Sequence, residues 1–151
     1  MQSQTKFTNH TALPSALSEA DVIRLLHDHD AMITQNPLVI HYEQCPQDAP
    51  DDEREGHWYQ LTDRINYLPG GILQGKVNYR AYLHNTPQGL RTHVYAPLGV
   101  HIHNVWSVRP GEDSLALQEQ VHLRCPFGVT NFIRRTMHKA HKDLVARLTS
   151  N

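Results

Sequence analysis

Two carboxylates occupy positions on predicted strands whose other residues on the same face are apolar. Residues two apart on a strand share a face. The odd positions of residues 58–68 are Tyr59, Leu61, Asp63, Ile65 and Tyr67, and those of residues 114–125 include Leu115, Leu117, Glu119, Val121 and Leu123. Burying an ionised carboxylate is costly, so each is expected to have a raised pKa or a hydrogen-bond donor beside it. A carboxyl group with a raised pKa can act as a general acid or base near neutral pH, which makes Asp63 and Glu119 the candidate catalytic residues.

A structural interpretation of the same two residues stays open. Each carboxylate can instead lie near a strand end in contact with water, or pair with an arginine and take no part in chemistry. A titration distinguishes the two interpretations, because a solvated carboxyl group titrates near about 4 and a desolvated one well above that value.

Polar and aromatic side chains on neighbouring segments extend this inner face. The same alternation turns Tyr79 inward from residues 72–84, Asn104 and Trp106 inward from residues 100–108, and Ile40 and Tyr42 inward from residues 38–44. A mostly apolar cavity with a few placed polar groups is the usual character of a small-molecule site. Ordinary core packing also explains the aromatic rings. The candidate ligand-binding residues are Tyr59, Tyr67, Tyr79, Asn104, Trp106, Phe132 and Met137.

The 12 histidines are the unusual feature of the composition. His101 and His103 lie two apart on one predicted strand, a spacing that can present two imidazoles to a metal ion. The alternation places both on the face opposite Trp106, which is the outer one, and no acidic ligand follows closely, so no metal site is expected. His141 borders the apolar stripe of the last predicted helix, where a partly exposed side chain is expected.

The apolar periods predict a strand, one or two helices, six further strands and a long helix. A strand is expected at residues 3–10, and Ser18 followed by two acidic residues starts a helical stretch that ends before Pro37. The period then changes to two, with strands at residues 38–44, 58–68, 72–84, 90–96, 100–108 and 114–125. Residues 45–55 are a predicted loop, and prolines with glycines mark turns at 69–71, 87–89 and 109–111. Residues 129–148 return to helical spacing with one apolar stripe, so a helix of about 30 Å is expected to pack on an antiparallel meander.

The totals restrict the class of protein. The 151 residues suit one domain, residues 1–151, and the 14 Lys and Arg nearly balance the 15 Asp and Glu, so no net field recruits nucleic acid. No nucleotide or nucleophile motif is present and there are two cysteines, so neither a cofactor nor a disulfide framework is expected. No apolar run approaches the about 20 residues of a membrane span, and the first residues are polar, so a cytoplasmic protein is expected. Exposed strand edges and an outward Trp58 leave a homodimer open.

The order of elements resembles the START/Bet v 1-like superfamily, also called SRPBCC or polyketide cyclase-like. Local phrases add to the resemblance and look most like uncharacterised fungal members. They are Leu26-His27-Asp28 with Asn36-Pro37-Leu38-Val39, the corner Ala96-Pro97-Leu98-Gly99-Val100, and Trp106-Ser107-Val108. The resemblance covers nearly the whole chain and implies an α+β helix-grip fold, in which a curved antiparallel sheet of about seven strands wraps round the C-terminal helix. An NTF2-like cone is the alternative architecture, but it normally ends on a strand.

Three functions are compatible with these features. The first is a cofactor-independent enzyme that binds a hydrophobic polyketide-, terpenoid- or alkaloid-like molecule and catalyses cyclisation, isomerisation or dehydration. The resemblance implies these reaction classes, and one fold hosts many functions. The second is a carrier or sensor of a lipid-like ligand, which needs no titrating group in its cavity. The third is a domain with a filled interior that acts through its surface.

Overall fold

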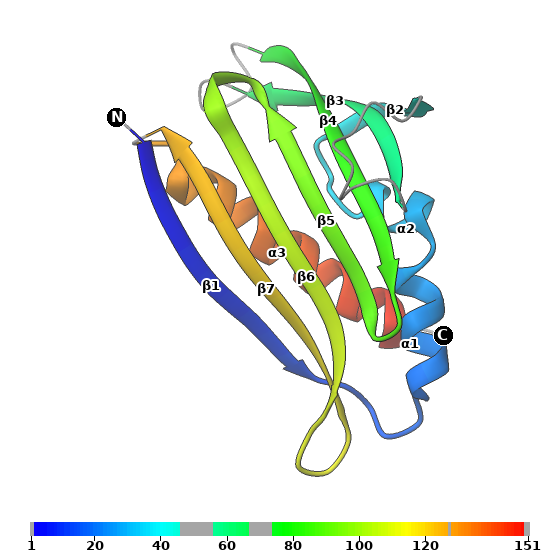
Figure 1. Ribbon diagram of the computed structural model, residues 1–151. Helices are drawn as coiled ribbons and strands as arrows, with labels where there is room; N and C mark the ends of the chain where they lie inside the picture. Colours follow the sequence, from blue (N-terminus) through cyan, green and yellow to red (C-terminus); the bar gives the residue numbers. More distant parts are fainter. Residues whose placement is uncertain (1, 46–55, 67–73, 127, 150–151) are drawn as a thin grey trace.

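A computed structural model describes residues 2–45, 56–66, 74–126 and 128–149. Over these residues a seven-stranded antiparallel sheet curves over one long helix (Figure 1), which is the predicted α+β helix-grip fold. The helices are α1 (Glu19–Leu26), α2 (His29–Thr34) and α3 (Thr130–Thr149). The strands are β1 (Gln2–Ala12), β2 (Val39–Cys45), β3 (His57–Asn66), β4 (Gln74–Thr86), β5 (Gly89–Ala96), β6 (Val100–Pro110) and β7 (Leu115–Pro126). No helix in the described part of the chain is long and apolar enough to cross a membrane.

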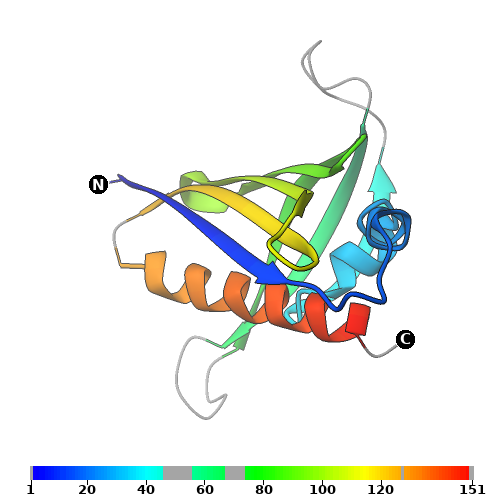
Figure 2. The ribbon, with the colours of Figure 1, turned by 90° about the horizontal axis from the view of Figure 1, so that it is seen from below.

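The first and last strands lie side by side. The sheet order is β1-β7-β6-β5-β4-β3-β2, so β2 to β7 form a meander and β1 pairs with β7. The β1–β7 ladder extends from the pair Gln2 and Pro126 to the pair Ala12 and Ala116. The chain then turns into α3, which lies along one face of the curved sheet (Figure 2). Inner side chains of β1, β6 and β7 can therefore meet side chains of α3.

The first short helix, α1, begins where the sequence predicts. Ser18 Oγ accepts a hydrogen bond from the backbone N–H of Asp21 at 3.1 Å, and the Asp21 carboxylate accepts one from the backbone N–H of Ser18 at 3.4 Å. Such reciprocal capping satisfies donors that the first helical turn leaves unpaired. Val22 and Leu26 of α1 are fully buried, so this helix packs one apolar face into the core.

The core consists of two apolar clusters. The larger cluster contains Leu117 of β7, Trp106 of β6 and Leu144 of α3, together with residues of α1, α2, β3, β4 and β5. The smaller cluster contains Val121, Leu123 and Cys125, with Ile102 and Met137 packed against it. Along β7, Glu119 stands between Leu117 and Val121. The division between the clusters is therefore at the level of Glu119.

Two predictions about the strands and turns of the sheet are wrong. Ile40 was expected to face inward but is 44% exposed, because the β2–β3 register shifts between Val39 and His41. Val39 packs against the core in place of Ile40, and Tyr42 packs inward as expected. The turn predicted at residues 109–111 begins later, since β6 continues to Pro110. The loop predicted at residues 45–55 and the turn at 69–71 fall, apart from Cys45, outside the described residues.

Candidate functional site

Glu119 lies in the middle of β7 and is almost completely buried, with 2% of its surface exposed. Its Oε1 accepts hydrogen bonds from Nδ2 of Asn9 and from Nδ1 of His141, both at 3.1 Å. Its Oε2 accepts one from Nδ2 of Asn104 at 2.6 Å. The donors come from β1, α3 and β6, and they offset the cost of burying the carboxylate. The partners are thus two amides and an imidazole rather than an arginine.

His141 continues this network towards the edge strand. Its Nε2 lies 3.0 Å from Oγ1 of Thr11, and its ring stacks on Trp106 with centroids 5.3 Å apart and planes 12° apart. Because an ionised carboxylate only accepts hydrogen bonds, Nδ1 must carry the proton donated to Glu119. Nε2 can then either accept from the Thr11 hydroxyl or donate to it.

The burial of His141, which is 4% exposed, contradicts the expectation of a partly exposed residue. The sequence holds a signal that identifies its position. Met137, His141, Leu144 and Leu148 are spaced i, i+4, i+7 and i+11, so they form one stripe along the helix. A histidine inside such a stripe faces the core and needs polar partners there.

Asp63 forms a second buried polar site, on the inner face of β3. It is 7% exposed, and its Oδ1 accepts a hydrogen bond from the Tyr79 hydroxyl at 2.9 Å. Burial raises the pKa of the Asp63 carboxyl above its ordinary value of 3.8, and hydrogen bonds from Tyr79 and Asn36 act in the opposite direction. Burial and the nearby Asp63 charge also raise the pKa of Tyr79. Asp63 therefore holds a proton at higher pH than a solvated aspartate does.

The two carboxylates do not form an acid/base pair with each other. Strands β4, β5 and β6 lie between β3 and β7 in the sheet. The row of cross-strand neighbours that starts at Glu119 of β7 passes through Trp106 of β6 and Leu90 of β5 and reaches β4 at Asn85. Asp63 pairs with β4 at Val77, which lies eight residues before Asn85 on that strand. Each carboxylate consequently has its own network at its own level of the sheet.

The predicted ligand-binding residues divide by their burial. Tyr59 and Trp106 are 7% and 6% exposed and belong to the larger core cluster, and the Tyr59 hydroxyl lies 2.9 Å from Nδ1 of His29. Tyr79 and Met137 are only half-buried, as are their apolar neighbours Val94 and Ile102. Phe132 of α3 is 38% exposed, and Asn104 is buried in the Glu119 network. Tyr67 lies outside the described residues.

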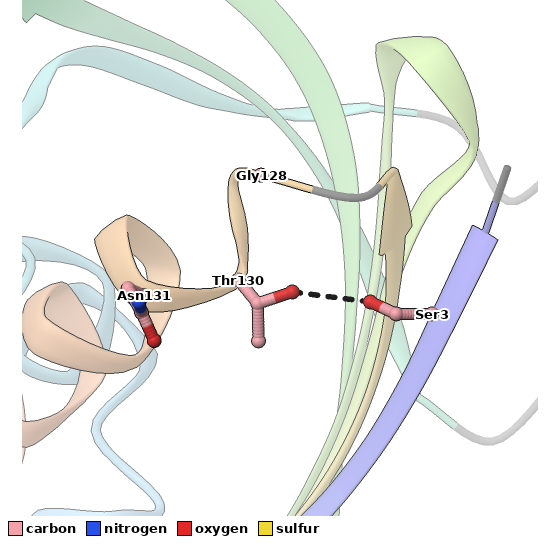
Figure 3. A pocket seen from close by; sticks show the side chains of 4 residues that line it. All are labelled: Ser3, Gly128, Thr130 and Asn131. Carbon is pink, nitrogen blue, oxygen red and sulfur yellow. Dashed lines mark hydrogen bonds between the residues drawn. The ribbon is translucent and has the colours of Figure 1, made fainter.

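Two hollows border the start of α3. One, of about 300 Å³, is lined by Ser3, Gly128, Thr130 and Asn131, and the hydroxyls of Ser3 and Thr130 are 3.1 Å apart across it (Figure 3). The other, of about 410 Å³, is lined by Asn131, Arg134, Arg135 and His138. Neither Asp63 nor Glu119 lines these two hollows, which lie at the surface.

The histidines of β6 have ring neighbours on the outer face. His103 is exposed and stacks on His93 of β5, with centroids 4.0 Å apart and planes 12° apart. Ile102 and Trp106 pack inward from the same strand, so the predicted alternation of β6 is confirmed. Within the described ranges, no three His, Cys, Asp or Glu side chains are grouped so that they could hold a metal ion.

Solved structures with the same fold have low sequence identity to this chain. A START superfamily protein from Mycobacterium smegmatis gives a TM-score of 0.60 at 16% identity over 97% of both chains. Ara h 8.0201 gives 0.63 at 10% identity over 100% of both chains. The Zhui aromatase/cyclase from a Streptomyces species gives 0.58 at 10% identity over 99% of this chain and 94% of that one. These similarities show that the chain has the same fold as these three proteins, one of which is described as a START superfamily protein.

Sequence comparison places the chain in a family. No curated protein gives a significant match to this sequence. The family described as Domain of unknown function (DUF7053) matches residues 2–151, nearly the whole chain. This protein therefore belongs to that family.

Proposed function

We propose that the protein binds a hydrophobic small molecule between the sheet and α3 and catalyses its cyclisation or isomerisation by acid/base chemistry, without a cofactor. The observation that carries the proposal is the Asp63–Tyr79 pair, a buried carboxyl on an apolar face with a hydroxyl at 2.9 Å. Burial raises the pKa of Asp63, so this carboxyl can exchange a proton with a substrate carbon or oxygen closer to neutral pH. The half-buried Tyr79, Val94 and Ile102 supply apolar surface on the same inner face.

The proposed roles differ between the two carboxylates. Asp63 is the acid/base, and Tyr79 orients it through the hydrogen bond to Oδ1. Glu119 stays a second candidate, but its three donors favour a positioning role, in which it holds Asn104 and His141. Tyr59, Tyr67, Trp106, Phe132 and Met137 stay predicted ligand contacts.

The finer expectations from the sequence belong to this proposal. The fold shared with an aromatase/cyclase supports a ring-forming reaction by analogy alone. Four expectations stay predictions: a polyketide-, terpenoid- or alkaloid-like ligand, a relationship to fungal proteins, a cytoplasmic location and a homodimer. The alternative function is a carrier or sensor of a lipid-like ligand, which the complete hydrogen bonding of the Glu119 carboxylate favours.

The test uses exchange of the α-protons of 2-tetralone, a bicyclic aromatic ketone, followed by proton NMR in D₂O. Asp63 as carboxylate would take an α-proton, leaving an enolate, and after exchange with solvent it would return a deuteron to the same carbon. The wild type is expected to accelerate exchange and Asp63→Asn to lose the acceleration. Asp143→Asn, which removes a carboxylate from the surface of α3, is the matched control and should exchange like the wild type.

Three outcomes are decisive. Acceleration that needs Asp63 supports the enzyme. Saturable binding of 2-tetralone without exchange favours the carrier. If 2-tetralone neither binds nor undergoes exchange, the result contradicts a ligand site between the sheet and α3.

A further inference from the structure

Asn104 has a side-chain amide whose orientation the structure determines. The residue lies on the inner face of β6 between Ile102 and Trp106 and is 7% exposed. Its Nδ2 donates to Oε2 of Glu119 at 2.6 Å. Because an ionised carboxylate only accepts hydrogen bonds, the nitrogen end of the amide must face Glu119. The oxygen end, Oδ1, must consequently point elsewhere.

Oδ1 of Asn104 is buried and has no hydrogen-bond partner among the described residues. Buried polar atoms are nearly always paired, since an unpaired acceptor loses its hydration without compensation. The cross-strand neighbours of Asn104 are Thr92 of β5 and Val121 of β7, and Ile102 lies on the same face of its own strand. Thr92 is half-buried, and Ile102 is half-buried and apolar. Apart from the Glu119 network, these neighbours of Asn104 in the sheet are therefore apolar, with one hydroxyl group among them.

We infer that Oδ1 of Asn104 selects the ligand, which is a neutral, largely apolar molecule that donates one hydrogen bond through a hydroxyl or N–H group. The inference rests on the proposed function, because it needs a ligand between the sheet and α3. An acceptor recognises donors only, so alcohols, phenols and amides fit it, whereas ethers and hydrocarbons leave it unpaired.

The neighbouring charge excludes a further ligand class. Glu119 is 2% exposed and lies behind the Asn104 amide. An anionic ligand at Oδ1 would bring a second negative charge near this carboxylate in a region of low dielectric constant, where repulsion is strong. Its oxygens would also meet an acceptor rather than a donor. Fatty-acid-like carboxylates are thus expected to be rejected.

Glu119, Asn9 and His141 act as positioning residues in this arrangement. Asn9 and His141 hold Oε1 of Glu119, and Oε2 holds the Asn104 amide. The three contacts fix the amide so that its nitrogen faces Glu119 and Oδ1 faces away from it, which limits the orientations that the amide must give up when a donor binds.

The experiment compares four naphthalene probes by calorimetry and by NMR titration at pH 7. They are naphthalene, 2-naphthol, 2-methoxynaphthalene and 2-naphthoate. The wild type is expected to bind 2-naphthol about three- to tenfold more tightly than naphthalene or the methyl ether, the range of one neutral hydrogen bond. Binding of 2-naphthoate should be weaker than binding of naphthalene itself.

Two variants isolate the contribution of Oδ1. Asn104→Leu should reduce the preference for 2-naphthol over the methyl ether to about onefold. Asn78→Leu is the matched control, because it removes an exposed amide from β4 and leaves the Glu119 network and Oδ1 of Asn104 in place, so the preference should persist. If Asn104→Leu does not fold, the wild-type Asn104 side-chain ¹³C carbonyl resonance decides. It should shift with 2-naphthol and not with the methyl ether.

The outcomes separate this inference from the proposed function. Equal binding of 2-naphthol and the methyl ether, or a preference that survives Asn104→Leu, overturns the subsite and leaves an interior ligand site standing. A carbonyl resonance that responds to both probes alike also overturns the subsite, because the response then does not depend on a donated hydrogen bond. Absence of binding by all four probes counts against the interior ligand site and the subsite together.

Discussion

Replacing His141 by phenylalanine is expected to destabilise the fold strongly, although phenylalanine is the more apolar residue. The new ring can still stack on Trp106, but the Nδ1–H that donates to Glu119 at 3.1 Å is lost. The carboxylate, 2% exposed, then keeps only the amides of Asn9 and Asn104. A buried acceptor that loses a hydrogen-bond donor costs about 1–3 kcal/mol, and more when the acceptor is charged. We therefore expect the free energy of unfolding to fall by about 3 kcal/mol, a large part of the about 5–15 kcal/mol typical of a domain.

The assay is urea unfolding at pH 7, followed by circular dichroism and tryptophan fluorescence. For a chain of this length the loss corresponds to a decrease in Tm of roughly 10 °C. His138→Phe is the matched control, since His138 lies one turn earlier on α3, is at least partly exposed, and has its ring 5.6 Å from Phe7. That substitution should change the free energy of unfolding by no more than about 0.5 kcal/mol.

A double-mutant cycle with Glu119→Gln tests the cause. The glutamine side chain introduced by this substitution carries no charge, so a neutral group would remain where His141→Phe alone leaves a charged one. The double variant should lose at least about 1 kcal/mol less than the sum of the two single losses. The reasoning is refuted if His141→Phe costs under about 1 kcal/mol, or if the two single losses simply add.

Three further predictions concern the Asp63 site, a strand contact and a helix cap. Burial raises the folded-state pKa of Asp63 above 3.8, so the stability that this carboxyl contributes is complete below its unfolded pKa and is lost as pH rises through the folded pKa. Wild type should thus lose stability relative to Asp63→Asn between about pH 3 and pH 7 in urea unfolding, and the opposite trend would contradict a desolvated carboxyl. Gly89→Ala should lower the free energy of unfolding by more than about 2 kcal/mol in thermal unfolding, because the added Cβ would collide with the backbone carbonyl of Trp106. The control Gly128→Ala has open space around the added Cβ and should cost about 1 kcal/mol, because the backbone φ at this position is positive. Ser18→Ala removes the cap of α1 and should cost about 1 kcal/mol, and an unchanged midpoint would show that the capping box does not stabilise the fold.

The sequence predicts the inner faces well because strand alternation has a fixed period. Asp63, Asn104 and Glu119 are all buried on the faces that parity assigned to them. The failure at Ile40 has a local cause, since a register shift beside it moves the alternation by one position. Alternation within one strand carries no information about such a shift.

The partners of the carboxylates could not be predicted from the same pattern. Asn9 precedes Glu119 by 110 residues, and His141 follows it by 22. Their meeting depends on β1 pairing with β7 and on the rotation of α3 about its axis. Helical spacing shows that His141 belongs to the apolar stripe, but it does not show which level of the sheet the residue meets. Tertiary packing supplies that information.

The hydrogen-bond network around Glu119 determines the position of α3 along the sheet, because His141 of α3 is one of its donors. Apolar contacts are nearly indifferent to a shift of one helical turn, because one apolar residue of the stripe can replace another. The hydrogen bond between His141 and Glu119 is not indifferent, since a shift of about 5.4 Å would bring Met137 or Leu144 to the carboxylate and leave the buried carboxylate without its imidazole donor. An apolar layer of the same volume would be at least as stable, so the specific gain from this network is a defined position of the helix. That position determines which residues of α3 face Asn104 and the half-buried apolar side chains of β5 and β6, where we propose that the ligand binds.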